Sequence, residues 1–288
     1  MSCRIVITGA GGQVGSFLSA QARREGRDVL ALTSAQWDIT DAAAAERIVQ
    51  AGDVVINCAA YTAVDAAESD RQRAFAVNAT APGYLAAACA RAGARLIHIS
   101  TDYVFSGDFG GAAPQPYEPD DKTDPLSVYG LSKLAGETAV LGASADAVVV
   151  RTAWVYTGGA GNDFVAIMRR LAGGDDTVAV VDDQVGSPTY VPDLAGALLQ
   201  IADGRIDHRV LHAANSGAVS RYEQARAVFA EAGADPARVR PCSSADHPRP
   251  AARPGYSALS GADSARAGLV PLRDWRSALT AALAVPPG

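Results

Sequence analysis

The sequence of 288 residues has few cysteines and no long hydrophobic run. Its four cysteines lie far apart and form no CxxC pair, a spacing that fits neither a zinc knuckle nor a disulfide framework. No apolar run reaches the ~18 residues needed to span a bilayer. The apolar stretch after Met1 is too short for the hydrophobic region of a signal peptide. These absences predict a cytoplasmic protein with no membrane contact.

Positive charge is also scarce. The chain has 25 Lys and Arg against 31 Asp and Glu, a formal net charge of −6, and no stretch is a run of basic residues. This balance argues against a nucleic-acid-binding protein, which would neutralise phosphates with clustered cations. The composition, 49% hydrophobic and 19% charged, is ordinary for a globular enzyme.

The first half of the chain alternates between short apolar runs and Ala-rich stretches. Several of the apolar runs are continuous, which is typical of parallel strands covered on both faces. The alternation predicts an α/β fold, a Rossmann-type doubly wound parallel sheet. The strand candidates are Arg4–Thr8, Asp28–Leu32, Asp53–Ala59, Arg95–Ser100 and Ala147–Thr152. The helix candidates are Val14–Arg24, Ala42–Gln50, Asp70–Ala92 and Ser132–Gly142.

After Trp154 the regular alternation ends. Helices are predicted at 164–172, 191–202, 222–232 and 275–284, with short strands at 178–181 and 210–213. Residues 182–189 are turn-rich, and residues 235–254 are rich in Pro and Arg and predicted to be irregular. We expect a dinucleotide-binding domain at 1–153, together with part of 187–215, and a smaller C-terminal lobe formed mainly by 154–288.

A glycine loop follows the first predicted strand. Gly9, Gly12 and Gly15 give the pattern GxxGxxG, and Gln13 and Val14 open the predicted helix. Such glycines permit a tight turn and let backbone N–H groups approach a pyrophosphate at the helix N-terminus. A purely structural turn is the alternative, but a strand before and a helix after favour a dinucleotide loop. No Gly-Lys-Ser/Thr follows, which excludes a P-loop.

The residues after the second predicted strand bear on the choice of cofactor. NAD-binding folds usually place an acid there for the ribose hydroxyls. This strand ends at Leu32-Thr33-Ser34, and the first acid is Asp38. The pattern favours NADPH, with NADH possible, although no arginine for a 2′-phosphate is evident.

Tyr129 and Lys133 stand four residues apart, so on a helix their side chains share one face. A nearby cation stabilises a phenolate and lowers the pKa of the tyrosine from its usual value near ~10. Thr101 follows the predicted strand 95–100, and ligands of parallel sheets bind beyond the carboxyl ends of the strands. We therefore expect Thr101 and Tyr129 to face one crevice, with Ser100 as the alternative to Thr101.

These motifs together resemble the extended short-chain dehydrogenase/reductases, and more closely the dTDP-4-dehydrorhamnose reductases. The resemblance covers nearly the whole chain, and its later motifs belong to the substrate-binding lobe of that family. The segments that carry it are Gly12–Gly15, Asn57–Asp65, Ser100–Phe105, Arg151–Tyr156, Asp183–Thr189 and Arg253–Ser257.

The resemblance implies reduction of the C4 ketone of dTDP-4-dehydro-L-rhamnose by a reduced nicotinamide. It implies that Tyr129 donates the proton, that Thr101 hydrogen-bonds the same oxygen and that Lys133 holds the nicotinamide ribose. It places Gly12, Gln13 and Val14 at the pyrophosphate, Asp38 and Ile39 at the adenine, and Ala59, Ala60 and Tyr61 at the nicotinamide. It places Asp102 and Trp154 at the sugar, with a core position at the strand end as the alternative for Trp154. Arg253 is a candidate for the substrate diphosphate, with a surface ion pair as its alternative.

One position departs from the family pattern. Some members form Mg²⁺-bridged dimers through acidic residues, one of them a glutamate where this chain has Phe17. Because a site without carboxylates holds a hard cation poorly, we favour a monomer. The four histidines show no ligand spacing, and no catalytic metal is predicted.

Three alternatives remain open at this point. The chain could be a 4-ketoreductase for another nucleotide-linked deoxysugar, as in antibiotic glycosylation, because pocket shape decides the sugar. It could be a non-catalytic regulatory subunit that binds a dinucleotide, which the intact set Thr101, Tyr129 and Lys133 disfavours. It could also be an epimerase or dehydratase that uses Asp102 as an acid or base.

Overall fold

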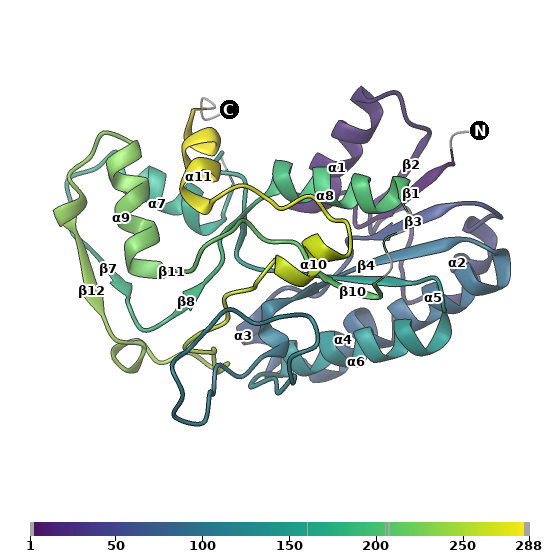
Figure 1. The fold of residues 1–288 in the computed structure, drawn as a ribbon, viewed down its shortest axis with the longest axis horizontal. Helices are drawn as coiled ribbons and strands as arrows, with labels where there is room; N and C mark the ends of the chain where they lie inside the picture. Colours follow the sequence, from purple (N-terminus) through teal and green to yellow (C-terminus); the bar gives the residue numbers. More distant parts are fainter. Residues whose placement is uncertain (1–2, 160, 205, 207, 285–288) are drawn as a thin grey trace.

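A six-stranded parallel sheet forms the centre of the protein, seen in a computed structural model that describes residues 3–159, 161–204, 206 and 208–284 (Figure 1). The strand order is β10-β5-β4-β3-β1-β2, and every neighbouring pair is parallel. The predicted doubly wound parallel sheet is therefore confirmed. Its strands are β1 (Ile5–Thr8), β2 (Val29–Leu32), β3 (Val54–Asn57), β4 (Arg95–Thr101), β5 (Val148–Thr152) and β10 (Val210–His212).

Helices cover both faces of this sheet. Successive strand residues point to opposite faces, so Ile5 and Ile7 pack towards α1 and α8, whereas Val6 packs towards the other helices. This double burial is the reason that the strands read as continuous apolar runs. One face is covered by α1 (Gln13–Arg24) and α8 (Val191–Asp203). The other is covered by α2 (Ala42–Ile48), α5 (Ala81–Ala92) and α6 (Val128–Ala143).

Two predicted helices differ from the observed ones. The stretch predicted as one helix, Asp70–Ala92, is divided into α4 (Arg71–Phe75), a π-helical segment η1 (Ala76–Thr80) and α5. Within η1, the Asn78 amide bonds the Tyr61 backbone and the Ser132 hydroxyl. Helix α6 begins at Val128 rather than Ser132, because the Ser127 hydroxyl caps it by accepting from the Gly130 N–H.

A second group of elements packs around its own apolar core beside the sheet, at the left of Figure 1. Its helices are α7 (Phe164–Ala172), α9 (Arg221–Glu231) and α11 (Trp275–Leu283). Its strand pairs are β7 (Val178–Val181) with β12 (Val239–Cys242), β8 (Val185–Gly186) with β11 (Val219–Ser220), and β6 (Val155–Tyr156) with β9 (Thr189–Tyr190). The short elements are α3 (Val64–Ala67), α10 (Ala262–Arg266) and the 3₁₀ turns Asp102–Val104, Pro236–Arg238 and Ser244–Asp246.

Strand β12 corrects the prediction that residues 235–254 are irregular. Val239 is buried in the second core, and this anchors a parallel pairing with β7 despite Pro241. The chain also returns to the large sheet after this group begins, since α8 covers one face and β10 forms an edge.

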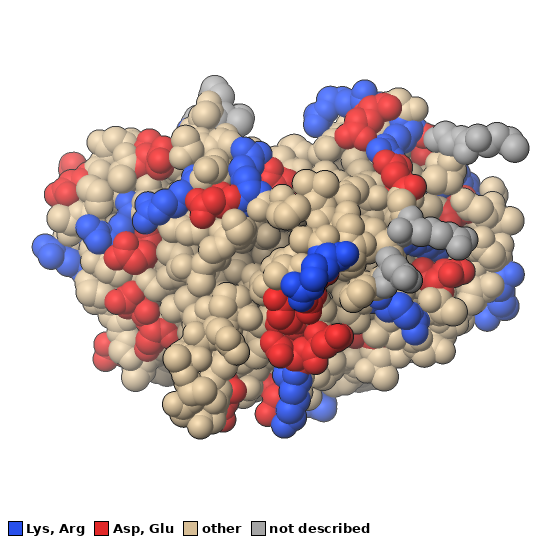
Figure 2. All heavy atoms as spheres, viewed as in Figure 1, with Lys and Arg blue, Asp and Glu red and all other residues tan. Residues whose placement is uncertain are grey.

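Acidic and basic side chains are interspersed over the face shown in Figure 2. Within the described ranges, no helix is both long enough and apolar enough to cross a membrane.

Candidate active site

The glycine loop lies where β1 meets α1, and its shape excludes larger side chains. Gly9 has φ +63°, and a Cβ there would lie 2.6 Å from the Ala59 nitrogen. A Cβ on Gly15 would lie 2.3 Å from the Gly9 carbonyl oxygen, so α1 can approach the loop only with glycine at that position. Gly12 is the N-cap of α1, and no described side chain caps this helix end. The loop therefore leaves helix N–H groups available to an anion, as a dinucleotide pyrophosphate requires.

Two adjoining cavities run along the carboxyl ends of the strands from this loop. One of about 520 Å³ reaches the end of β2, and its lining includes Gly9, Gly12, Ser34, Asp38, Ile39, Ala59, Ala60, Tyr61 and Arg73. The other, of about 490 Å³, is lined among others by Gly12, Gln13, Val14, Ala59, Ala60, Thr101, Asp102, Tyr129, Lys133, Trp154 and Arg221. The structure thus brings together all the predicted site residues except Gly15, which packs beneath the loop, and Arg253. The paired cavities suit a long two-part ligand such as a dinucleotide.

Gln13 links the loop to the second group of elements. Its side-chain Nε2 donates to the Asp163 carboxylate at 2.9 Å, and the same carboxylate caps α7 by accepting from the Ala166 N–H. The Gln13 side chain is therefore engaged away from the loop, and its backbone N–H is the group available for the predicted pyrophosphate contact.

Tyr129 and Thr101 face each other in the second cavity. Burial raises the pKa of the Tyr129 phenol, and a hydrogen bond with the Thr101 hydroxyl opposes this effect. The expectation that Lys133 lowers the phenol pKa is not met, because burial has the largest effect on this pKa and Lys133 is not among the groups that shift it. A phenol that keeps its proton is suited to donate that proton to a developing alkoxide. Ser100, the alternative to Thr101, also lines the cavity, but its buried hydroxyl has no partner among the described residues.

Lys133 lies one helical turn after Tyr129 and is 2% exposed. Its Nζ donates to the Ile99 carbonyl at 2.7 Å and lies 3.4 Å from the His98 Nε2. Burial lowers the pKa of Lys133 to about 8, partly opposed by the charge of Glu137.

Asp102 is buried beside Thr101. Its carboxylate accepts from the Ser257 hydroxyl at 2.6 Å and from the Thr101 hydroxyl at 3.1 Å. Burial raises its pKa to about 6, against these two hydrogen bonds. A carboxyl group that titrates near neutrality can either accept or donate a hydrogen bond to a ligand.

Trp154 lines the second cavity, and the Arg221 guanidinium lies over its indole ring. The Arg221 guanidinium lies 3.5 Å from the ring centroid and 4.8 Å from that of Phe164. Burial lowers the pKa of Arg221 to about 10. Its side chain makes one hydrogen bond among the described residues, to Gln224 at 3.2 Å. The cavity therefore holds a buried cation as well as an aromatic face.

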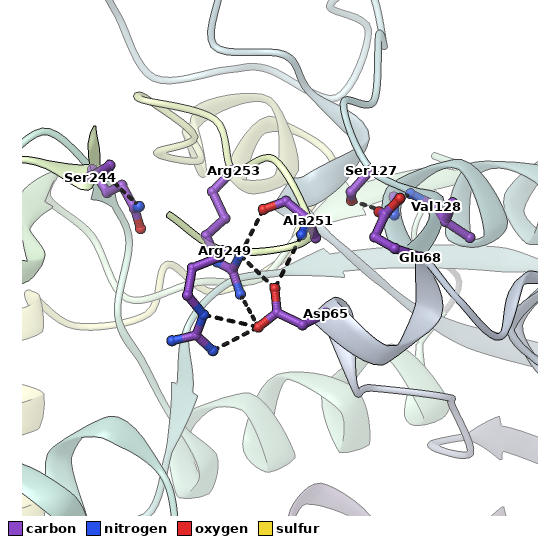
Figure 3. A network of polar contacts seen from close by, with 10 residues as sticks. Asp65, Glu68, Ser127, Val128, Ser244, Arg249, Ala251 and Arg253 are labelled. Carbon is purple, nitrogen blue, oxygen red and sulfur yellow. Dashed lines mark hydrogen bonds and ion pairs between the residues drawn. The ribbon is translucent and has the colours of Figure 1, made fainter. Parts of the chain in front are cut away.

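Arg253 lies outside the main cavity, in an ion pair. Both terminal nitrogens of its guanidinium donate to the Asp65 carboxylate, at 2.9 and 3.0 Å. Arg249 and the Ala251 N–H donate to the same carboxylate (Figure 3). Figure 3 shows Asp65 projecting from α3 towards this loop, so the network ties residues 249–253 to α3. The ion pair that the sequence left as an alternative is present, and the diphosphate role stays a prediction.

Sequence reasoning missed two cations of the site, Arg73 and Arg221. Arg73 comes from α4 and lines the cavity beside Ser34 and Asp38, where no cation was evident from the sequence. Arg221 begins α9, far along the chain. The pattern Ser220-x-x-Glu223 is typical of a helix start, and the Ser220 hydroxyl caps α9. This local pattern does not predict that Arg221 lines the cavity.

Comparisons with known proteins agree with this geometry. The family described as RmlD substrate binding domain matches residues 3–285. A dTDP-4-dehydrorhamnose reductase of Mycobacterium tuberculosis is 71% identical over 98% of this chain and 93% of its own length. The crystal structure of a dTDP-4-dehydrorhamnose reductase from Clostridium acetobutylicum is 37% identical over 98% of both chains, with a TM-score of 0.91. One from Bacillus anthracis, in complex with NADP, is 36% identical over 97% of this chain and 98% of its own, with a TM-score of 0.90. The chain therefore belongs to the family of the dTDP-4-dehydrorhamnose reductases, which are oxidoreductases.

Proposed function

We propose that this protein reduces the C4 ketone of dTDP-4-dehydro-L-rhamnose to the alcohol of dTDP-L-rhamnose, with a nicotinamide cofactor. The observation that carries the proposal is the placement of Thr101, Tyr129 and Lys133 in one cavity that adjoins the glycine loop. When bound, a reduced nicotinamide supplies the hydride. The chain supplies the proton and holds the ketone oxygen.

Tyr129 is the proton donor in this proposal. Its phenol is protonated at neutral pH and burial holds its pKa above the usual range, so the proton moves to the substrate oxygen only as negative charge develops there. The Thr101 hydroxyl hydrogen-bonds the same oxygen, and Lys133 orients the nicotinamide ribose. Gly9, Gly12 and the first turn of α1 hold the pyrophosphate.

The cofactor proposal is a preference for NADPH, with NADH accepted less well. Two features at the end of β2 support it. The exposed side chains of Ser34 and Arg73 line the adenosine end of the cleft, and an arginine there can bind a 2′-phosphate. Hydrogen bonds from Thr40 lower the pKa of Asp38 and the charge of Arg73 lowers it further, which indicates that the two charges lie near each other.

The substrate side of the proposal rests on the second cavity. In this proposal Asp102 and Trp154 contact the sugar and Arg253 binds the diphosphate. The support for Arg253 is its electrostatic interaction with Tyr103, a lining residue of that cavity. We further propose a cytoplasmic monomer without a catalytic metal. Phe17, which stands where a bridging glutamate would be needed, packs partly on the sheet core and supplies no carboxylate.

The test compares Tyr129→Phe with wild-type protein in an assay of NADPH and NADH oxidation with dTDP-4-dehydrorhamnose. We expect kcat to fall by ~100-fold or more, with cofactor affinity unchanged, because only proton donation is lost. The matched control is Tyr84→Phe, since Tyr84 is exposed on α5. This control should leave kcat unchanged.

The alternatives give different outcomes in the same assay. A protein that binds cofactor but reduces only another nucleotide-linked keto-deoxysugar would be a ketoreductase of a different pathway. Cofactor binding without turnover of any such ketone would favour a regulatory subunit. Failure to bind either cofactor would contradict the dinucleotide assignment and with it the proposed reaction.

A further inference from the structure

A row of buried polar side chains crosses three neighbouring strands and ends at Lys133. Thr8, Asn57 and His98 are paired in register on β1, β3 and β4. The Thr8 hydroxyl donates to the Asn57 Oδ1 at 2.6 Å, and the Asn57 Nδ2 lies 2.9 Å from the His98 Nδ1. The His98 Nε2 in turn lies 3.4 Å from the Lys133 Nζ. Each of these four side chains is at most 2% exposed, so water does not compete for their hydrogen bonds.

The orientation of the Asn57 amide is determined by its neighbours. The Ala59 backbone N–H, which can only donate, points at the Asn57 Oδ1 at 3.2 Å. The oxygen must therefore face Ala59 and Thr8, and the NH₂ group must face His98. Since that NH₂ group is a donor, the His98 Nδ1 has to accept. The ring proton of neutral His98 is then on Nε2, the nitrogen that faces Lys133.

His98 stays neutral in this environment. Burial holds the pKa of His98 well below its usual range, and an ammonium on Lys133 lowers it further, so His98 is neutral next to either form of the lysine. A neutral ring with its proton on Nε2 directs an N–H at the Lys133 nitrogen. The Nζ already donates to the Ile99 carbonyl at 2.7 Å. A lysine amine has a lone pair that can accept from the His98 N–H, whereas an ammonium has none.

We infer that His98 is a positioning residue for Lys133: held by Asn57 as the Nε2–H tautomer, it favours the amine form of Lys133 over the ammonium and fixes the nitrogen against the Ile99 carbonyl. The other charged groups near Lys133 do not provide this effect. Glu137, one turn further along α6, favours the ammonium, and its carboxylate is bound to Arg151 of β5.

The remaining neighbours of Lys133 complete its surroundings. Tyr129 lies on its own helix, and Asp102 lines the same cavity from the turn after β4. The π-helical segment η1, which packs against α6, presents the neutral Asn78 to Ser132. Among the side chains that the structure describes, His98 is therefore the one that directs a hydrogen-bond donor at the Nζ.

Only the consequence for cofactor binding rests on the proposed function. A lysine whose amine form is favoured titrates within the pH range in which the reductase would operate, so the ribose-binding group would lose its charge at mildly alkaline pH. The tautomer and the lysine titration are properties of the protein alone and can be measured without substrate or cofactor.

The test is NMR of protein labelled with ¹⁵N-histidine and ¹³C-lysine. The chain has two lysines, so a Lys122→Arg variant assigns the Lys133 signal directly. In the wild-type protein we expect His98 to show a protonated Nε2 and an unprotonated Nδ1. In His98→Gln, whose amide oxygen can face the Nζ, we expect the Lys133 titration midpoint to rise by about one pH unit or more.

The matched control is His212→Gln, which changes a second buried histidine that lies on β10 outside this row. That variant should leave the Lys133 midpoint unchanged. A protonated Nδ1 on His98 of the wild-type protein would overturn the inference, even where His98→Gln does not fold. An unchanged Lys133 midpoint in a folded His98→Gln protein would overturn it as well. Because neither readout uses turnover, a failed ketone assay would contradict the proposed reaction and leave this inference standing.

Discussion

The Arg221 guanidinium lies 3.5 Å from the centroid of the Trp154 ring, in a cavity that also holds Thr101 and Tyr129. Trp154 has φ +48°, and among the described residues it is the one non-glycine with positive φ. Such a conformation costs of the order of 1–3 kcal/mol and persists only where surrounding contacts hold it. Here the contacts are the Arg221 cation and Gly186, where a Cβ would lie 2.5 Å from the indole Cε2.

Gly186→Ala should therefore displace the Trp154 ring. We expect KM for the nucleotide-sugar substrate to rise by about 10-fold, the equivalent of ~1.4 kcal/mol, because the ring forms one wall of the proposed sugar site. Steady-state kinetics and the tryptophan fluorescence spectrum check this prediction.

The control for this substitution is Gly196→Ala, in α8. A Cβ at that position meets no atom within 4 Å, so KM and the spectrum should stay as in the wild type. Equal effects of the two substitutions would show that Gly186 acts through general stability rather than through Trp154.

Asp102 gives the folded protein a specific pH dependence. Burial raises the pKa of its carboxyl from 3.8 to about 6, so between pH 4 and pH 6 the folded state binds more protons than the unfolded chain. The free energy of unfolding consequently falls as the pH rises through this window. Above about pH 6 the full cost of burying the ionised Asp102 carboxylate is present. Asp102→Asn removes the cost, and its stability relative to the wild type should rise by about 2–3 kcal/mol between pH 4 and pH 7.

Urea denaturation at the two pH values measures this difference. The matched control is Asp120→Asn, which changes an exposed aspartate and should alter the free energy of unfolding by less than ~0.5 kcal/mol at either pH. A stability difference for Asp102→Asn that stays constant with pH would contradict the raised carboxyl pKa.

The parts of the site that sequence reasoning could predict are those encoded locally. Glycines at 9 and 15 are required because a Cβ there would lie 2.6 and 2.3 Å from backbone atoms, and their spacing in the GxxGxxG pattern predicts this loop. The Tyr129–Lys133 spacing likewise predicts a shared helical face. The start of that helix was placed four residues late because the cap, Ser127, precedes an apolar run that gives no clear periodicity.

The parts that sequence reasoning missed depend on distant segments of the chain. Arg221 reaches the cavity because α9 begins beside Trp154, and Arg73 of α4 lines the other cavity together with Ser34 and Asp38, which are distant in the sequence. The pKa of Tyr129 was predicted in the wrong direction because proximity to Lys133 is a local fact, whereas burial of the phenol depends on the whole fold. The His98 contact with Asn57 likewise needs the strand register, which residue spacing does not supply.

Glu137 of α6 and Arg151 of β5 form a buried ion pair. Their side chains are 3% and 5% exposed, and two hydrogen bonds of 2.9 and 2.7 Å join them. Arg151 also donates to the Pro119 carbonyl at 2.9 Å. Glu137→Ala leaves a buried guanidinium without its counter-charge and should lower the free energy of unfolding by about 3–5 kcal/mol in urea denaturation.

The exposed pair Arg91–Glu46 provides the comparison for this prediction. Both of its side chains are 59% exposed, so Glu46→Ala should cost less than ~1 kcal/mol. The double variant Glu137→Leu/Arg151→Met should recover part of the loss, since it leaves no unpaired charge. If Glu137→Ala costs no more than Glu46→Ala, the buried pair does not stabilise the fold.

Arg73 should determine the cofactor preference. If its guanidinium binds the 2′-phosphate of NADPH, Arg73→Ala removes a charge-assisted hydrogen bond worth about 1.5–3 kcal/mol, and KM for NADPH should rise by about 10- to 100-fold. KM for NADH, which has no 2′-phosphate, should stay within about 2-fold of the wild type. The matched control is Arg71→Ala, because Arg71 is exposed on the same short helix but stacks on Phe75 outside the cleft lining. An equal rise in KM for NADPH and NADH in Arg73→Ala would show instead that Arg73 supports the shape of the adenosine end and does not bind the 2′-phosphate.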